Sequence, residues 1–156
     1  MIHQTMSNFI SRIMGTKKTI NESANQPYAE ALYCEQKCIN HLNLLQYMQA
    51  KNVDTSEVGR LIYLYQKDTH LLMRWGVIYA ACMDCGLFVP MEVSRFTILL
   101  KSLIYNLKVD RTSVSRGVKD FYDNMQLREQ GKILAPDVLT FIKAKDTLET
   151  KLRALQ

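Results

Sequence analysis

The sequence predicts an all-α fold: an irregular or orthogonal bundle of five to six helices with an amphipathic helix at the N-terminus. Glycine and proline are sparse, at six and three of 156 residues, whereas turn-rich β architectures use both often. Apolar residues recur at intervals of three and four along most of the chain, which is the spacing of one helix face. No segment alternates convincingly with a period of two, so strands are not expected.

The first predicted element is a short amphipathic helix over residues 2–14, which ends near Gly15. Its apolar stripe consists of Ile2, Met6, Phe9, Ile10, Ile13 and Met14. The polar stretch that follows predicts a linker, so residues 1–26 are interpreted as an N-terminal arm. Because an isolated helix this short is marginal in water, the stripe needs a surface. That surface is the protein's own core, a second copy, another protein, or a weak contact with a membrane surface.

Residues 27–130 are predicted to form the helical core domain. The stripe of its first helix consists of Ala31, Cys34, Cys38, Leu42, Leu45 and Met48. The next helix is predicted to run unbroken over residues 56–85, since it is apolar on two sides, as the most buried helix of a bundle usually is. Asp54 is its predicted N-cap, and Gly86 is the predicted residue just after its end.

Two further helices complete the predicted core domain. The first begins at Pro90 and runs to about Asn106. The second covers about residues 112–127, with Asp110 or Thr112 as its cap. Its apolar stripe consists of Val114, Val118, Phe121 and Met125.

The C-terminal segment, residues 131–156, is predicted to contain a last helix that packs on the core or on a partner. Pro136 suits the first position of this helix, because proline lacks the N–H that a helix start leaves unbonded. Apolar faces at the two ends of the chain are the predicted partner-binding residues: Phe9, Ile10, Ile13, Leu148, Leu152 and Leu155.

Positive charge is concentrated in one part of the chain. The net charge is +5, and residues 101–119 alone carry an excess of +4, with Asp110 as the only acidic residue among five cations. The predicted basic patch consists of Lys101, Lys108, Arg111, Ser113, Arg116 and Lys119. Such a patch suits nucleic acid, an acidic protein or a membrane surface, or it is simply a solvated face.

Residues 106–121, NLKVDRTSVSRGVKDF, resemble the helix-turn-helix of bacterial repressors, in which a similar Val-Ser-Arg string begins the recognition helix. Four positions that are apolar in that motif are filled by Leu103, Leu107, Val109 and Val114. Three positions depart from it: Ile104 replaces a small residue, Lys108 a turn glycine, and Gly117 an apolar residue. The resemblance implies that DNA would be contacted by Arg111, Thr112, Ser113, Ser115, Arg116 and Lys119.

The four cysteines form two close pairs, Cys34 with Cys38 and Cys82 with Cys85. Two facing helices could bring four thiolates into a tetrahedral zinc site. Both pairs, however, lie on apolar helix sides, where free cysteine packs as a small hydrophobic residue. The preferred interpretation is therefore core thiols, with no metal and no cofactor. Cysteines without a secretory signal or membrane span predict a cytoplasmic protein with reduced thiols.

No catalytic arrangement can be identified: there is no Ser–His–Asp order, glycine-rich phosphate loop or carboxylate pair. The sequence therefore predicts a non-enzymatic adaptor or accessory protein, which binds other proteins in a larger assembly through apolar helix faces and the basic patch. The predicted partners are proteins, including a second copy. The alternative is a helix-turn-helix-like DNA-binding regulator that uses residues 95–125.

Overall fold

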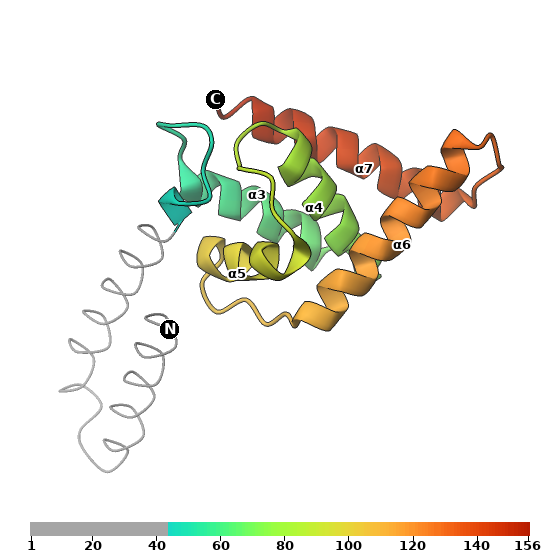
Figure 1. The fold of residues 1–156 in the computed structure, drawn as a ribbon, viewed down its shortest axis with the longest axis horizontal. Coiled ribbons are helices and arrows are strands. Elements are labelled where there is room, and N and C mark those ends of the chain that lie inside the picture. Colours follow the sequence, from blue (N-terminus) through green and yellow to red (C-terminus); the bar gives the residue numbers. More distant parts are fainter. Residues whose placement is uncertain (1–43) are drawn as a thin grey trace, which may run out of the picture. The chain divides into compact units, whose positions relative to one another are not determined.

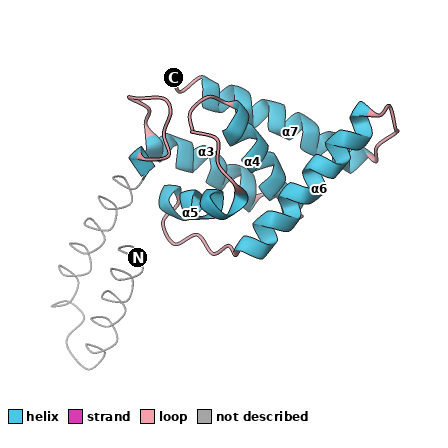
Figure 2. Cartoon of the chain, viewed as in Figure 1, coloured by secondary structure: helices cyan, strands magenta, loops and turns pink. Residues whose placement is uncertain are grey.

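The computed structural model describes residues 44–156. The chain divides into two units, residues 1–46 and 47–156, and almost all described residues belong to the second. The described part contains five α-helices and no strand, which confirms an all-α fold (Figures 1 and 2). These helices are α3 (Thr55–Lys67), α4 (Met73–Asp84), α5 (Val93–Leu103), α6 (Arg111–Glu129) and α7 (Pro136–Arg153). The predictions for residues 2–14, for the linker and for the first core helix fall outside the described residues.

The prediction of one unbroken helix over residues 56–85 was wrong. The chain forms two helices there, because α3 ends at Lys67 and α4 begins only at Met73. Thr69 helps to end α3, since its Oγ1 donates a hydrogen bond to the Tyr65 carbonyl at 3.2 Å and satisfies an acceptor that a helix end leaves free. The break changes the chain direction, so the two apolar sides belong to two separate helices that pack around one core.

Several predicted helix ends are confirmed, but the helix predicted from Pro90 to about Asn106 is shorter and spans Val93–Leu103. Asp54 and Asp110 are the N-caps of α3 and α6: the Asp54 carboxylate accepts hydrogen bonds from the backbone N–H groups of Ser56 and Glu57, and the Asp110 carboxylate accepts one from that of Ser113. Gly86 follows the end of α4 with a φ of +81°, a backbone conformation that glycine adopts without strain. Pro136 is the first residue of α7.

Helix α4 is the centre of the described unit. Most of its residues are buried, including Trp75, Val77, Ile78 and Cys82, and its most extensive contacts are with α6 and α7. Figure 1 shows it surrounded by the other four helices. No helix in the described part of the chain is both long enough and apolar enough to cross a membrane.

Two glycines let α4 and α6 cross with their backbones in contact. A methyl group added at Gly117 would overlap the carbonyl oxygen of Leu72 and lie 3.1 Å from Cβ of Trp75. A methyl group at Gly76 would overlap Cβ of Phe121 and the Gly117 carbonyl. Gly117 is one of the departures from the helix-turn-helix pattern, and this crossing gives its physical reason: the space for a side chain is filled by α4.

Candidate protein-binding surfaces

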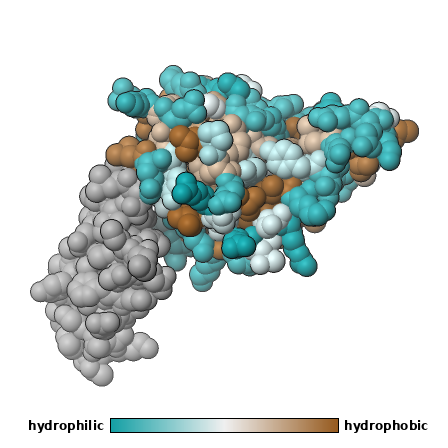
Figure 3. Space-filling view, in the orientation of Figure 1, coloured by the Kyte–Doolittle hydropathy of each residue, from teal (hydrophilic) through white to brown (hydrophobic). Residues whose placement is uncertain are grey.

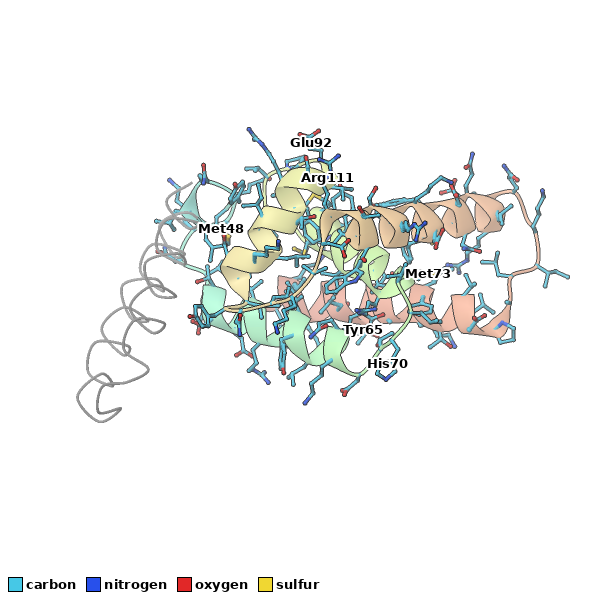
Figure 4. All side chains as sticks on the ribbon, turned by 90° about the horizontal axis from the view of Figure 1, so that it is seen from below. Met48, Tyr65, His70, Met73, Glu92 and Arg111 are labelled. Atoms are coloured by element: carbon cyan, nitrogen blue, oxygen red, sulfur yellow. The ribbon has the colours of Figure 1, made fainter. Side chains whose placement is uncertain are left out.

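The predicted basic patch lies on the surface formed by the end of α5, the connection after it and the first turns of α6. We call it the α5–α6 basic surface. All five cations of the patch, Lys101, Lys108, Arg111, Arg116 and Lys119, are exposed, whereas Ser113 is half-buried. Figure 4 labels Arg111 at the start of α6. The five cations are therefore accessible to solvent, and their role in binding stays a prediction.

Only part of this charge is neutralised by neighbouring residues. Lys119 forms a salt bridge with Asp123, with Nζ 2.6 Å from Oδ2, and this hydrogen bond raises the pKa of Lys119. The Asp110 carboxylate accepts hydrogen bonds from the backbone N–H and the hydroxyl of Ser113, at 2.7 and 3.2 Å. These bonds, together with the nearby charge of Lys101, lower the pKa of Asp110. Asp110 is thus occupied in capping α6.

The other four cations of the surface form no salt bridge within the described residues. They are Lys101, Lys108, Arg111 and Arg116. Next to them on α5, Ile98 is 55% exposed and lies one helical turn before Lys101, so both side chains are on the same side of the helix. The surface therefore combines unpaired positive charge with an exposed apolar side chain.

The connection between α5 and α6 differs from that of a helix-turn-helix. The motif joins its helices by a turn of about three or four residues, whereas residues 104–110 separate α5 from α6. Ile104 follows the end of α5 and lies close to Gly59 of α3. A methyl group added at Gly59 would lie 3.8 Å from Cγ1 of Ile104. Helix α6 also packs mainly on α4 rather than on α5. The side chains implied to contact DNA are nevertheless exposed, apart from Ser113.

The described cysteines are core residues. Cys82 and Cys85 are both fully buried, and the Cys85 thiol donates a hydrogen bond to the Cys82 carbonyl at 3.2 Å. Burial raises the pKa of both thiols, that of Cys82 strongly, so they stay protonated at neutral pH. Zinc requires thiolates, and no group of three potential metal ligands occurs among the described residues. Cys34 and Cys38 lie outside the described residues.

The predicted apolar partner-binding residues at the C-terminal end belong to α7 and the residues after it. Leu148 and Leu152 are 4% and 0% exposed, covered by the chain's own helices, and Leu155 is half-buried. A partner would reach Leu152 only if α7 moved away from its neighbours, whereas Leu148 lines a groove described below. The other three, Phe9, Ile10 and Ile13, lie outside the described residues.

A shallow groove that the sequence did not reveal runs between α3 and α7. We call it the α3–α7 groove, and its volume is about 340 Å³. Figures 1 and 4 show the two helices side by side and running in opposite directions. The face of the molecule shown in Figure 3 is mixed, with hydrophilic areas along its edges and apolar areas between them. The groove is lined by Leu61, Leu64, Tyr65, Asp68, Ala144, Thr147, Leu148 and Lys151.

A network of charged residues, which the sequence did not reveal either, fastens α7 to the end of α4. Nζ of Lys145 lies 2.8 Å from the Asp84 carboxylate and 2.6 Å from that of Glu149. Arg153 pairs with Glu149 at 2.9 Å and donates to the Asp84 carbonyl. Spacings of four residues between Lys145, Glu149 and Arg153 were the available sequence signal.

Tyr65 is a wall residue of the groove whose hydroxyl is buried (Figure 4). The hydroxyl has no hydrogen bond of ordinary geometry within the described structure, because the nearby Thr69 hydroxyl donates to the Tyr65 backbone carbonyl, although the Thr69 side chain is close enough to lower the pKa of the phenol. Burial raises the pKa of this phenol to about 12. The hydroxyl is therefore neutral and unsatisfied, which is an unfavourable arrangement for a buried polar atom.

No family model, curated protein or solved structure matches this chain.

Proposed function

We propose that the protein is a non-enzymatic cytoplasmic adaptor or accessory protein, which binds an acidic surface of another protein through the α5–α6 basic surface. The observation that supports this proposal is the group of four exposed cations without salt bridges in the described part of the chain: Lys101, Lys108, Arg111 and Arg116. Unpaired cations on adjoining elements create a positive potential, which accelerates the approach of an acidic partner and disfavours a basic one.

Charge alone gives specificity more readily than affinity, so the partner also needs an apolar contact. Ile98 provides one, because it is 55% exposed and lies beside Lys101 on α5.

A DNA-binding regulator using residues 95–125 is the alternative function. It is favoured by the exposure of Arg111, Thr112, Ser115 and Arg116 on α6. It is disfavoured by the connection of residues 104–110, which is longer than the turn of a helix-turn-helix. A DNA-binding regulator would retain nucleic acid through contacts with its phosphates, so nucleic-acid detection in one purification separates the two functions.

The test is native affinity purification of the full chain, with mass spectrometry and nucleic-acid detection on the same eluate. The charge-reversal variant Lys101→Glu/Arg116→Glu should reduce the affinity for the recovered protein by at least about tenfold, since each reversed pair loses attraction and gains repulsion. The matched control is Lys132→Glu/Lys143→Glu, which reverses two exposed cations outside this surface and should bind normally.

An equal loss in both variants would mean that only total charge matters, and it would contradict a specific surface. Recovery of nucleic acid, lost with Arg116→Glu, would establish the regulator instead. Failure to recover any protein partner of the wild-type chain would also overturn the adaptor proposal.

A further inference from the structure

The α3–α7 groove has the dimensions of a short helix-binding site. On α3 it extends from Leu61 to Asp68, and on α7 from Ala144 to Lys151. Seven residues of helix rise by about 10 Å, which is two turns. The volume of about 340 Å³ corresponds to roughly ten water molecules at their liquid density. The groove can therefore take two or three side chains of a partner but not a whole domain.

The lining of the groove combines apolar and polar residues and is partly accessible. Leu148 forms its floor and is 4% exposed, whereas Leu64 on the rim is 36% exposed. The α3 wall presents Leu61 and Leu64, and the α7 wall presents the smaller Ala144 and Thr147 beside Leu148. Small residues on one wall let a third backbone come close, while leucines on the other wall interdigitate with its side chains.

A helix is the partner element that this site suits. Side chains on two antiparallel helices form ridges at intervals of three and four residues, which match the ridges of a third helix. A strand would need a sheet edge for its backbone hydrogen bonds, and the described residues contain only an isolated bridge between Met48 and Phe88. The partner helix would insert apolar side chains at positions i, i+3 or i+4, and i+7.

The two ends of the groove carry opposite charges. Asp68 and Lys151 are the charged residues among those that line it. Because α3 and α7 are antiparallel (Figure 4), Asp68 lies at the Ala144 end and Lys151 at the Leu61 end. Both are exposed, and neither forms a salt bridge within the described structure.

We propose that the α3–α7 groove binds an amphipathic helix of a partner protein in one direction, with its N-terminal end at Asp68 and its C-terminal end at Lys151. A helix carries partial positive charge at its N-terminus and partial negative charge at its C-terminus. Basic residues in the first turn of the partner helix and acidic residues in its last turn complement Asp68 and Lys151. The groove shares no residue with the α5–α6 basic surface, so this proposal does not depend on the function proposed above.

The first experiment places a photo-cross-linking amino acid at position 64 in the full chain, in the native host. The matched control places it at position 139, since Leu139 is also an exposed leucine, at 42% against 36% for Leu64, but does not line the groove. We expect one cross-linked protein specific to position 64. Mapping should locate the link in an amphipathic segment with basic residues before the apolar ones and acidic residues after them. No link at position 64, or the same links at both positions, would overturn the proposal.

The second experiment measures binding of the mapped segment, made as a synthetic peptide, to the purified full chain. Leu64→Glu should weaken binding more than tenfold, and Leu139→Glu should leave it unchanged. Asp68→Lys and Lys151→Glu should each weaken binding by about three- to tenfold, as expected for exposed charge pairs aided by a helix dipole.

The double variant Asp68→Lys/Lys151→Glu tests the direction. It should bind a peptide with exchanged terminal charges better than the original peptide. If the original peptide binds the wild type and the double variant equally well, the proposed direction is wrong. Thermal unfolding followed by circular dichroism establishes that each variant is folded. Lys101→Glu/Arg116→Glu should not affect the peptide, which separates this proposal from the function proposed above.

Discussion

The α4–α6 crossing and the α3–α7 groove are two contacts between helices that the same chain builds in opposite ways. At the crossing, Gly76 and Gly117 remove the side chains between the helices, and the backbones touch. Along the groove, side chains such as Leu61 and Leu64 keep the helices apart and leave about 340 Å³ open. A filled contact holds the fold and tolerates no added atoms, whereas an open one contributes less to stability and is free to bind. Substitutions in the two places should therefore have very different effects.

The largest expected effect is at the crossing. Gly117→Ala should lower the free energy of unfolding by about 3 kcal/mol, the upper part of the range for overpacked sites. The added methyl group meets the Leu72 carbonyl, which is backbone and cannot rotate away. Urea denaturation measures this loss. The control Ser115→Ala, exposed on the same helix, should change the free energy by less than about 0.5 kcal/mol.

An increase in the free energy of unfolding of Gly117→Ala would contradict the close contact between α4 and α6. Alanine is intrinsically better than glycine in the middle of a helix by about 1 kcal/mol. If Gly117→Ala stabilised the protein by that amount, α4 and α6 would have to be farther apart than they are in this structure, and the contrast with the groove would disappear.

The sequence predicted the helical elements better than it predicted how they pack. Asp54, Asp110, Gly86 and Pro136 are local signals, since each residue satisfies or avoids a hydrogen bond within one turn. The break between α3 and α4 was missed, because apolar residues continue on both sides of it and mask the polar residues 67–70.

The candidate surfaces could be predicted only in part for a related reason. Exposure of the cations around Arg111 follows from their charge, so this exposure could be predicted from the sequence alone. Whether Gly117 meets Gly76, or Leu64 and Leu148 line one groove, depends on residues far apart in the chain, and one sequence contains no information on such pairs. The groove and the crossing therefore became visible only in the fold.

An intermediate effect on the free energy of unfolding is expected from Glu149, in the charged network that fastens α7 to the end of α4. Burial alone would raise the pKa of Glu149, but the combined hydrogen bonds and charges of Lys145 and Arg153 outweigh burial and hold it below the ordinary 4.5. A carboxyl group with a lowered pKa stabilises the fold above its unfolded pKa, and this contribution is lost as the pH falls through the folded pKa.

Glu149→Gln should therefore lower the free energy of unfolding by about 2 kcal/mol at pH 7, as expected for lost hydrogen bonds to charged groups. The difference from the wild type should shrink as the pH falls from about 5 towards 3. Urea denaturation at several pH values measures it, with Glu129→Gln on the exposed end of α6 as the control. A difference that stays constant with pH would mean that the charge of Glu149 does not hold α7 in place.

The smallest effect, and the sharpest test of the groove, is expected from Tyr65→Phe. A buried tyrosine hydroxyl that makes a hydrogen bond costs about 1 kcal/mol when it is removed. The Tyr65 hydroxyl makes none within the described structure, so its removal should be neutral or stabilise the fold by up to about 1 kcal/mol. Tyr79→Phe is the matched control, because the Tyr79 hydroxyl donates to the Met91 carbonyl at 2.5 Å, and it should destabilise the fold by about 1 kcal/mol.

The alkaline range provides a second measurement on the same pair of variants. The Tyr65 phenol has a pKa of about 12 in the folded protein and an ordinary value of 10 when unfolded. Between these values only the unfolded chain releases the proton, so the wild type should lose stability as the pH rises, and Tyr65→Phe should lose less. Equal destabilisation by Tyr65→Phe and Tyr79→Phe at pH 7 would mean that the Tyr65 hydroxyl has a partner after all. The groove wall would then have no buried polar atom without a hydrogen bond. The groove and the α4–α6 crossing would differ only in the volume that each leaves open.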